Sequence, residues 1–163
     1  MNLKPARCLI LACGNTLRED DGVGPWLAAW AEERFATQPG VCVLARQQWT
    51  PDLAQDISEA GSVVFIDCVV NAVAGEVKIA PVEPAAVESG PATHHVGAAE
   101  LLSLSKELYN KSPRASLLLT VGAGSLELRE GFSEAVQAAL PDACAQLETT
   151  VFRMIADSAS QRA

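Results

Sequence analysis

Nearly continuous hydrophobic runs alternate along the chain with segments in which hydrophobic residues recur at helical spacing. Residues 7–13 (RCLILAC) and 62–70 (SVVFIDCVV) have the pattern of strands buried on both faces of a sheet. Shorter apolar runs at residues 41–44 and 115–121 predict two further strands. Residues 75–82 alternate and contain a lysine and a proline, which favours an edge strand over a central one. The pattern therefore predicts a sheet of about five strands.

Four segments have the spacing of helices with one apolar face. The first begins at a Gly-Pro pair, residues 24–25, and ends at residues 38–40 (QPG). The other three are residues 51–60, about 97–111 and about 133–155. We expect Ser133 to cap the last helix. Because strands and helices alternate, the sequence predicts an α/β fold with a mostly parallel sheet covered on both faces and a site at the carboxyl ends of its strands.

The length and composition fit a single folded domain spanning residues 1–163. Hydrophobic residues make up 49% of the chain and charged residues 20%, which is enough apolar material for a sizeable core and too little charge for a disordered chain. The 12 Lys and Arg against 20 Asp and Glu give a net charge of −8, and no basic run occurs. Nucleic acids and anionic membrane surfaces are therefore poor partners.

The apolar runs also bear on where the protein resides. None approaches the ~20 residues needed to cross a bilayer, so we expect no membrane insertion. The first apolar run is too short for a signal-peptide core, so we expect the cytoplasm. The five cysteines are odd in number and form no CxxC pair, which favours reduced thiols over disulfide or zinc roles.

The glycine-containing turn after the first strand, GNTLREDDGVG at residues 14–24, superficially suggests a dinucleotide site. It lacks GxGxxG, and Glu19, Asp20 and Asp21 would place like charge beside a pyrophosphate. These acids could instead stabilise the dipole of the following helix, a role that suits Asp20 better than Asp21. If Asp21 does not have this role, it is a candidate catalytic or metal-binding carboxylate.

Two more chemical groups lie near expected ends of elements. Asp67 interrupts an apolar strand, where an unpaired carboxylate would be costly unless it is paired, metal-bound or near an exposed end. His94 and His95 precede the helix expected from residue 97, where a simple loop role is the alternative to a ligand role. Two carboxylates and one imidazole form a set that suits a divalent transition metal with open positions. No GxSxG elbow occurs, and no cysteine neighbours a histidine in sequence.

Three motifs resemble those of the hydrogenase maturation endopeptidases: GNTLREDDGVG after the first strand, FIDC at a later strand end, and THHVGAAELL before a helix. The segment LLLTVGAGSLELREGFSEAVQAAL resembles that family's last strand, loop and C-terminal helix, so the resemblance covers about residues 7–155. It implies a three-layer α/β/α sandwich around a twisted sheet. It also implies an endopeptidase that removes the C-terminal extension of a [NiFe] hydrogenase large-subunit precursor after nickel insertion.

The resemblance further implies a metal site made by Asp21, Asp67 and His94, with His95 as the fallback and the two aspartates as catalytic residues. The family has been described both as aspartic and as metal-dependent. The implied metal is nickel supplied by the precursor, with zinc or cadmium as candidate substitutes in vitro. Asn15 is a candidate to orient a carboxylate or the substrate.

One segment departs from many relatives. Residues 46–53 (RQQWTPDL) replace a glycine-rich loop, so the resemblance leaves open which hydrogenase is the substrate. Gln48 and Thr50 are candidates to line a specificity cleft. Of the three tryptophans, Trp26, Trp30 and Trp49, we expect two to pack in the core.

Three other functions remain open at the level of the sequence. A small-molecule metallohydrolase could use the same ligands and would bind zinc without a protein partner. A nucleotide- or phosphate-binding domain would need the turn at Gly14 to hold an anion. A non-catalytic module that escorts a precursor would keep its function after Asp67→Ala.

Overall fold

The structure is a computed structural model that describes residues 7–85 and 96–160. Within these residues, five strands and four α-helices mostly alternate, with one pair of strands in succession, and a short 3-10 helix precedes the first α-helix. The strands are β1 (Cys8–Cys13), β2 (Val41–Arg46), β3 (Ser62–Val69), β4 (Val77–Pro81) and β5 (Ala115–Gly122). The helices are η1 (Glu19–Gly22), α1 (Val23–Arg34), α2 (Leu53–Glu59), α3 (Ala98–Tyr109) and α4 (Glu134–Ser160).

The strands form one sheet in the order β2-β1-β3-β5-β4. All neighbouring pairs are parallel except β4 with β5, which is antiparallel. The edge position of β4 confirms the expectation from its alternating, proline-containing sequence, because an edge strand loses no ladder bond to a proline on its open side. The predicted α/β fold with a mostly parallel sheet of five strands is confirmed.

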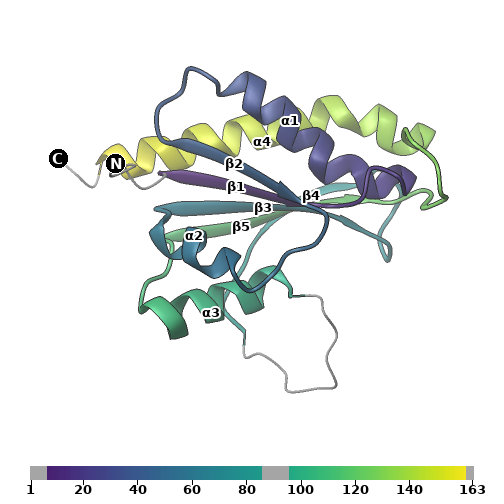
Figure 1. Ribbon diagram of the computed structural model, residues 1–163. Coiled ribbons are helices and arrows are strands. Elements are labelled where there is room, and N and C mark those ends of the chain that lie inside the picture. Colours follow the sequence, from purple (N-terminus) through teal and green to yellow (C-terminus); the bar gives the residue numbers. More distant parts are fainter. Residues whose placement is uncertain (1–6, 86–95, 161–163) are drawn as a thin grey trace, which may run out of the picture.

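Helices cover both faces of the sheet, as Figure 1 shows, with α1 and α4 on one face and α2 and α3 on the other. Side chains of β1 alternate between the two cores: Ile10 packs towards α1 and α4, whereas Leu9 and Leu11 pack towards α2 and α3. β1 is therefore apolar on both faces, as is β3, whose Val64 and Phe65 belong to opposite cores, and this explains the continuous hydrophobic runs of these two strands.

The register of the central strands brings the site together. Ala12 of β1 pairs with Ile66 of β3, so the end of β1 at Cys13 lies beside Asp67. By alternation, Asp67 is on the same face as Val63 and Phe65, the face covered by α2 and α3. Both strand ends point to the same edge because the strands are parallel.

Two helix starts illustrate the local signals. Ser133 caps α4 as expected, since its Oγ accepts a hydrogen bond from the Val136 N–H at 3.4 Å. At the first crossover, α1 begins at Val23, and the acidic residues before it form η1 rather than the first turn of α1. No helix within residues 7–85 and 96–160 is both long and apolar enough to cross a membrane.

Candidate active site

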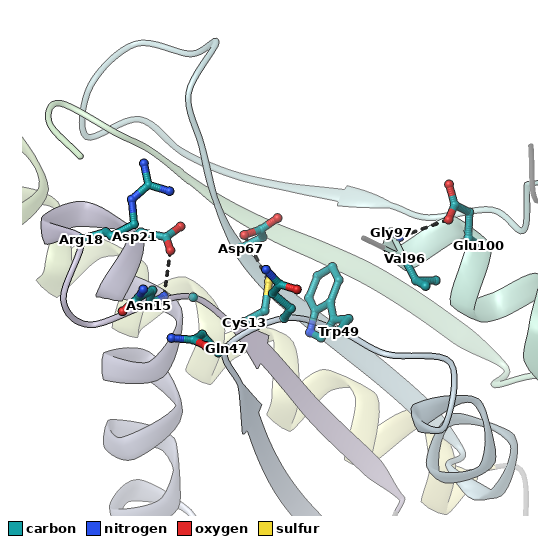
Figure 2. Close-up of a pocket in the computed structure, with 12 residues that line it drawn as sticks. Cys13, Asn15, Arg18, Asp21, Gln47, Trp49, Asp67, Val96, Gly97 and Glu100 are labelled. Atoms are coloured by element: carbon teal, nitrogen blue, oxygen red, sulfur yellow. Dashed lines mark hydrogen bonds between the residues drawn. The ribbon is translucent and has the colours of Figure 1, made fainter. Parts of the chain in front are cut away.

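A pocket of about 590 Å³ opens at the carboxyl ends of β1 and β3 (Figure 2). Its walls come from the end of β1 and the turn after it, the segment after β2, the end of β3 and the start of α3. The lining residues that matter for chemistry are Cys13, Arg18, Asp21, Gln47, Gln48, Trp49, Asp67 and Glu100. The structure thus brings Asp21 and Asp67 to one pocket, at the place where a parallel α/β sheet binds its ligands.

Asp21 is oriented by the turn that follows β1. The backbone N–H of Asn15 donates to Asp21 Oδ2 at 2.8 Å, and Asn15 Oδ1 accepts from the Leu17 N–H at 2.9 Å. Asn15 therefore orients the carboxylate through its backbone, while its side chain shapes the turn. Gly14 has φ +150°, and a Cβ there would lie 1.9 Å from the Asp21 carbonyl oxygen, so only glycine fits this close approach.

Asp67 is half-buried near the end of β3. Its Oδ1 accepts hydrogen bonds from the Cys68 N–H at 2.8 Å and from the Cys13 thiol at 3.3 Å. Burial raises the pKa of Asp67 and the charge of Asp21 adds to this, while the hydrogen bonds from Cys13 and Cys68 act in the opposite direction. The influence of Asp21 on this pKa reflects two like charges that share one pocket.

Cys13 and Cys68 are poor nucleophiles in this setting. Burial raises the pKa of the Cys13 thiol far above its ordinary value, and the neighbouring charge of Asp67 raises it further. Burial, with the charges of Asp21 and Asp67, raises the pKa of Cys68 to about 12. A reactive cysteine needs the opposite environment, in which a nearby positive charge favours the thiolate.

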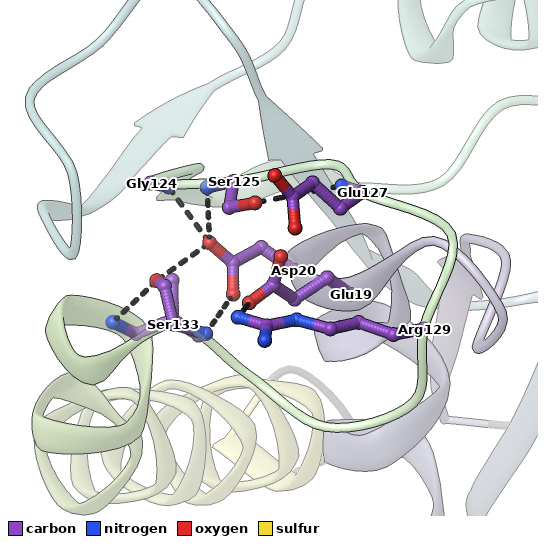
Figure 3. Close-up of polar contacts among 8 residues, drawn as sticks. Glu19, Asp20, Gly124, Ser125, Glu127, Arg129 and Ser133 are labelled. Carbon is purple, nitrogen blue, oxygen red and sulfur yellow. Dashed lines mark hydrogen bonds and ion pairs between the residues drawn. The ribbon is translucent and has the colours of Figure 1, made fainter.

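Asp20, between two site residues in sequence, has a structural role. Its side chain is 0% exposed and accepts hydrogen bonds from the backbone of Gly124 (2.7 Å), Ser125 (2.9 Å) and Ser133 (2.7 Å), and from the Ser133 hydroxyl (2.7 Å) (Figure 3). Burial favours a raised pKa, but these hydrogen bonds outweigh it and hold the pKa of Asp20 below its ordinary value. Asp20 therefore fastens the turn before α1 to the loop before α4. Within the described residues, its carboxylate accepts no hydrogen bond from the first turn of α1.

Glu19 extends this connection. It is only 1% exposed, lies at φ +44°, and forms an ion pair with Arg129. The Glu19 backbone N–H also donates to the Arg129 carbonyl at 2.9 Å. A non-glycine residue at positive φ persists only where its surroundings hold it, and here Arg129 holds Glu19, two positions before Asp21.

The carboxylates leave capacity for a metal. In the described part of the chain, Asp21 Oδ1 and Asp67 Oδ2 accept no hydrogen bond, so each residue keeps one oxygen for a cation. No three His, Cys, Asp or Glu side chains within residues 7–85 and 96–160 lie close enough together to hold a metal ion. The expected third ligand, His94, and its fallback His95 lie outside the described residues.

Several pocket residues were not anticipated as functional. Cys13 and Arg18 flank the turn, and Glu100 lies at the start of α3, where its Oε2 accepts from the Gly97 N–H at 3.4 Å. Cys13 could have been found from its position as the last residue of a strand that ends at the site. Gln48 lines the pocket as expected, whereas Thr50 is not among the lining residues.

The tryptophans divide as the sequence suggested. Trp49 is buried and Trp30 of α1 packs against the core, whereas Trp26 is 39% exposed. Trp49, however, also lines the pocket.

Comparison with solved structures shows what this arrangement resembles. The hydrogenase maturating endopeptidase HybD from Escherichia coli superposes with a TM-score of 0.73 at 23% identity, over 90% of this chain and 93% of that one. The [NiFe] hydrogenase maturation protease HybD from Thermococcus kodakarensis superposes with a TM-score of 0.65 at 26% identity, over 88% of this chain and 98% of that one. The [NiFe] hydrogenase maturation protease HycI from the same organism superposes with a TM-score of 0.61 at 23% identity, over 91% of this chain and 92% of that one.

The chain has the fold of the hydrogenase maturation endopeptidases. The shared fold confirms the resemblance seen in the motifs, and the match extends over nearly the full length of each solved structure. No protein-family model matches the sequence, and a search of curated proteins finds no match.

Proposed function

We propose that this protein is an endopeptidase of hydrogenase maturation that removes the C-terminal extension of a [NiFe] hydrogenase large-subunit precursor after nickel insertion. One observation carries the proposal: Asp21 and Asp67, from separate segments, line a single pocket in a chain with the fold of such endopeptidases. The similar structures are described as maturation endopeptidases or proteases, which supports a peptide as the substrate.

Nickel in this proposal belongs to the precursor, and this chain's carboxylates recognise it. Asp21 and Asp67 would hold the ion through the oxygens that accept no hydrogen bond within the described residues, with His94 as the third ligand expected from the sequence. Hard oxygen donors with one imidazole suit a divalent transition metal, including zinc or cadmium as substitutes in vitro. When bound, such an ion acts as a Lewis acid and lowers the pKa of bound water.

The residues of the chain would then fix the geometry. The Asn15 N–H holds one oxygen of Asp21, and the Cys68 N–H and Cys13 thiol hold one oxygen of Asp67, so each carboxylate keeps its orientation as substrate binds. Burial raises the pKa of Asp67, and a shift in this direction favours a role in proton transfer.

Two other chemistries fit less well. Cysteine protease chemistry is disfavoured because burial and acidic neighbours raise the pKa of Cys13. Phosphate binding at the turn is disfavoured because several of its N–H groups already have acceptors. Those of Gly14, Asn15 and Arg18 donate to Arg46 O, Asp21 Oδ2 and Asn15 O. We place the reaction in the cytoplasm, where the five free thiols would stay reduced.

The test is the intact mass of a nickel-loaded large-subunit precursor after incubation with the protein. We expect a discrete C-terminal loss with the wild-type protein, none with nickel-free precursor, and none with Asp67→Asn. Asp56→Asn, an exposed aspartate on α2, is the matched control and should process normally. Intact precursor with folded wild-type protein would contradict the proposal. Tight zinc binding without processing would indicate a small-molecule metallohydrolase. Binding of the precursor without its cleavage would indicate an escort module.

A further inference from the structure

Trp49 lies on one wall of the pocket that Asp21 and Asp67 share. Its side chain is 5% exposed, and its ring packs edge-to-face on Phe65 of β3, with ring centroids 5.3 Å apart and planes at 69°. Figure 2 shows the indole beside Asp67 and Cys13. The core below the pocket therefore holds the ring in one orientation.

Among residues 7–85 and 96–160, the indole N–H of Trp49 has no hydrogen-bond partner. Trp49 Nε1 is buried, and no acceptor lies within hydrogen-bonding distance of it in the part of the chain that the structure describes. A buried tryptophan N–H normally finds an acceptor, because leaving the group unpaired in a site shielded from water is destabilising. An acceptor that arrives with a ligand would satisfy this donor.

The charges around the pocket indicate which acceptor fits. Asp21, Asp67 and Glu100 line it, so an incoming anion would be repelled from most of its surface. Arg18 lies on the far side of Asp21 from Trp49 in Figure 2. Gln47 and Gln48, the two residues before Trp49 in the sequence, add neutral amides to the lining. Apart from the carboxylate of Asp67, this wall thus offers uncharged hydrogen-bonding groups.

We infer that Trp49 binds the substrate peptide, with its indole N–H donating to a backbone carbonyl oxygen of the precursor near the scissile bond. The inference rests on the proposed function and names a residue of the substrate-binding surface. In Figure 2 the nitrogen edge of the indole is on the side of Cys13 and Gln47, not on the side of Val96. A peptide lying across the two carboxylates would pass that edge.

Trp49→Phe tests this, because phenylalanine keeps the contact with Phe65 and lacks the N–H. Replacement of Trp49 by 3-benzothienylalanine is the closer test, since it retains the bicyclic shape and substitutes sulfur for the N–H. We expect both variants to process nickel-loaded precursor with kcat close to wild type and KM raised roughly tenfold, as for one lost hydrogen bond in ground-state binding. Trp30→Phe, on the opposite face of the sheet, is the matched control and should leave KM unchanged.

The outcomes separate this inference from the proposed function. If wild-type protein processes the precursor and the benzothienylalanine variant has an unchanged KM, the inference is wrong and the function stands. A fall in kcat at unchanged KM would also overturn it, because the N–H would then act in the transition state and not in substrate binding. If wild-type protein does not process the precursor, the proposed function itself fails. Thermal unfolding of each variant verifies that it is folded.

Discussion

The thiol of Cys13 donates a hydrogen bond to Oδ1 of Asp67 across 3.3 Å, joining the ends of two neighbouring parallel strands. This contact makes the cysteine a poor nucleophile, because burial and the adjacent carboxylate both raise its pKa. It also makes the cysteine one of two donors that hold Asp67 in place, the other being the Cys68 N–H. Cys13 is therefore placed to position Asp67.

Cys13→Ala should reduce processing of nickel-loaded precursor by less than about tenfold, since one weak donor is lost and the Cys68 N–H remains. Removal of a catalytic nucleophile would instead cost roughly 10⁴-fold or more. Cys13→Ser, which keeps a donor, should lie closer to wild type. A loss as large as that of a nucleophile in Cys13→Ala, measured as an initial rate, would revive a cysteine mechanism.

Asp21→Asn should separate activity from stability. The amide is isosteric and its oxygen can still accept from the Asn15 N–H, so we expect the free energy of unfolding to fall by about 1 kcal/mol or less. Processing should fall at least about 100-fold, because the amide is neither a good ligand nor a base. Denaturant titration and the precursor assay together measure this. A variant with normal activity would show that Asp21 has only a local role.

The sequence predicted the fold in most of its parts because strands buried on both faces leave continuous apolar runs. It predicted that β4 lies at an edge because its lysine and proline are unsuited to a central position. It did not predict η1, since the acids at its start have no helical periodicity and are held by residues more than 100 positions away. Local sequence carries no signal of such contacts.

The candidate site was only partly predictable for the same reason. Asp21 and Asp67 were identifiable as carboxylates near expected strand ends, and the structure brings both to one pocket. The bond between Cys13 and Asp67 depends on the register of two strands, which the sequence does not specify. Likewise, only the structure shows that the Trp49 N–H is buried without an acceptor among the described residues.

Gly14→Ala should damage both the fold and the site. A Cβ at this position would meet the Asp21 carbonyl oxygen at 1.9 Å, and φ +150° is unfavourable for any other residue. We expect a loss of about 3 kcal/mol in the free energy of unfolding. Gly97→Ala is the control, because nothing lies within 4 Å of a Cβ there, and it should change stability by less than about 1 kcal/mol. Equal stabilities of the two variants would contradict the close approach.

Asp20 should make stability depend on pH in the acid range. Its pKa in the folded protein lies below the ordinary value of 3.8, so the unfolded state takes up the proton first as the pH falls. The stabilisation is therefore complete above about pH 4 and is lost as the pH falls through the lower pKa of the folded state.

Asp20→Asn should be less stable than wild type by about 3 kcal/mol at pH 7, because Asn offers only one acceptor oxygen to four donors. The stability difference, from denaturant titrations, should narrow below pH 4; a constant difference would contradict the lowered pKa.

His94→Ala and His95→Ala test the third ligand, which the sequence motif THHVGAAELL assigns to His94. In the proposed metal site, Asp21 and Asp67 would each supply one oxygen that accepts no hydrogen bond within the described residues. The loss of an imidazole ligand should therefore weaken zinc binding at least about tenfold and abolish processing. The neighbouring substitution should have a milder effect on both, because adjacent side chains rarely reach the same ion. Equilibrium dialysis with zinc measures binding independently of catalysis. The reverse ranking would move the ligand to His95, and unchanged zinc binding in both variants would leave Asp21 and Asp67 without a histidine partner.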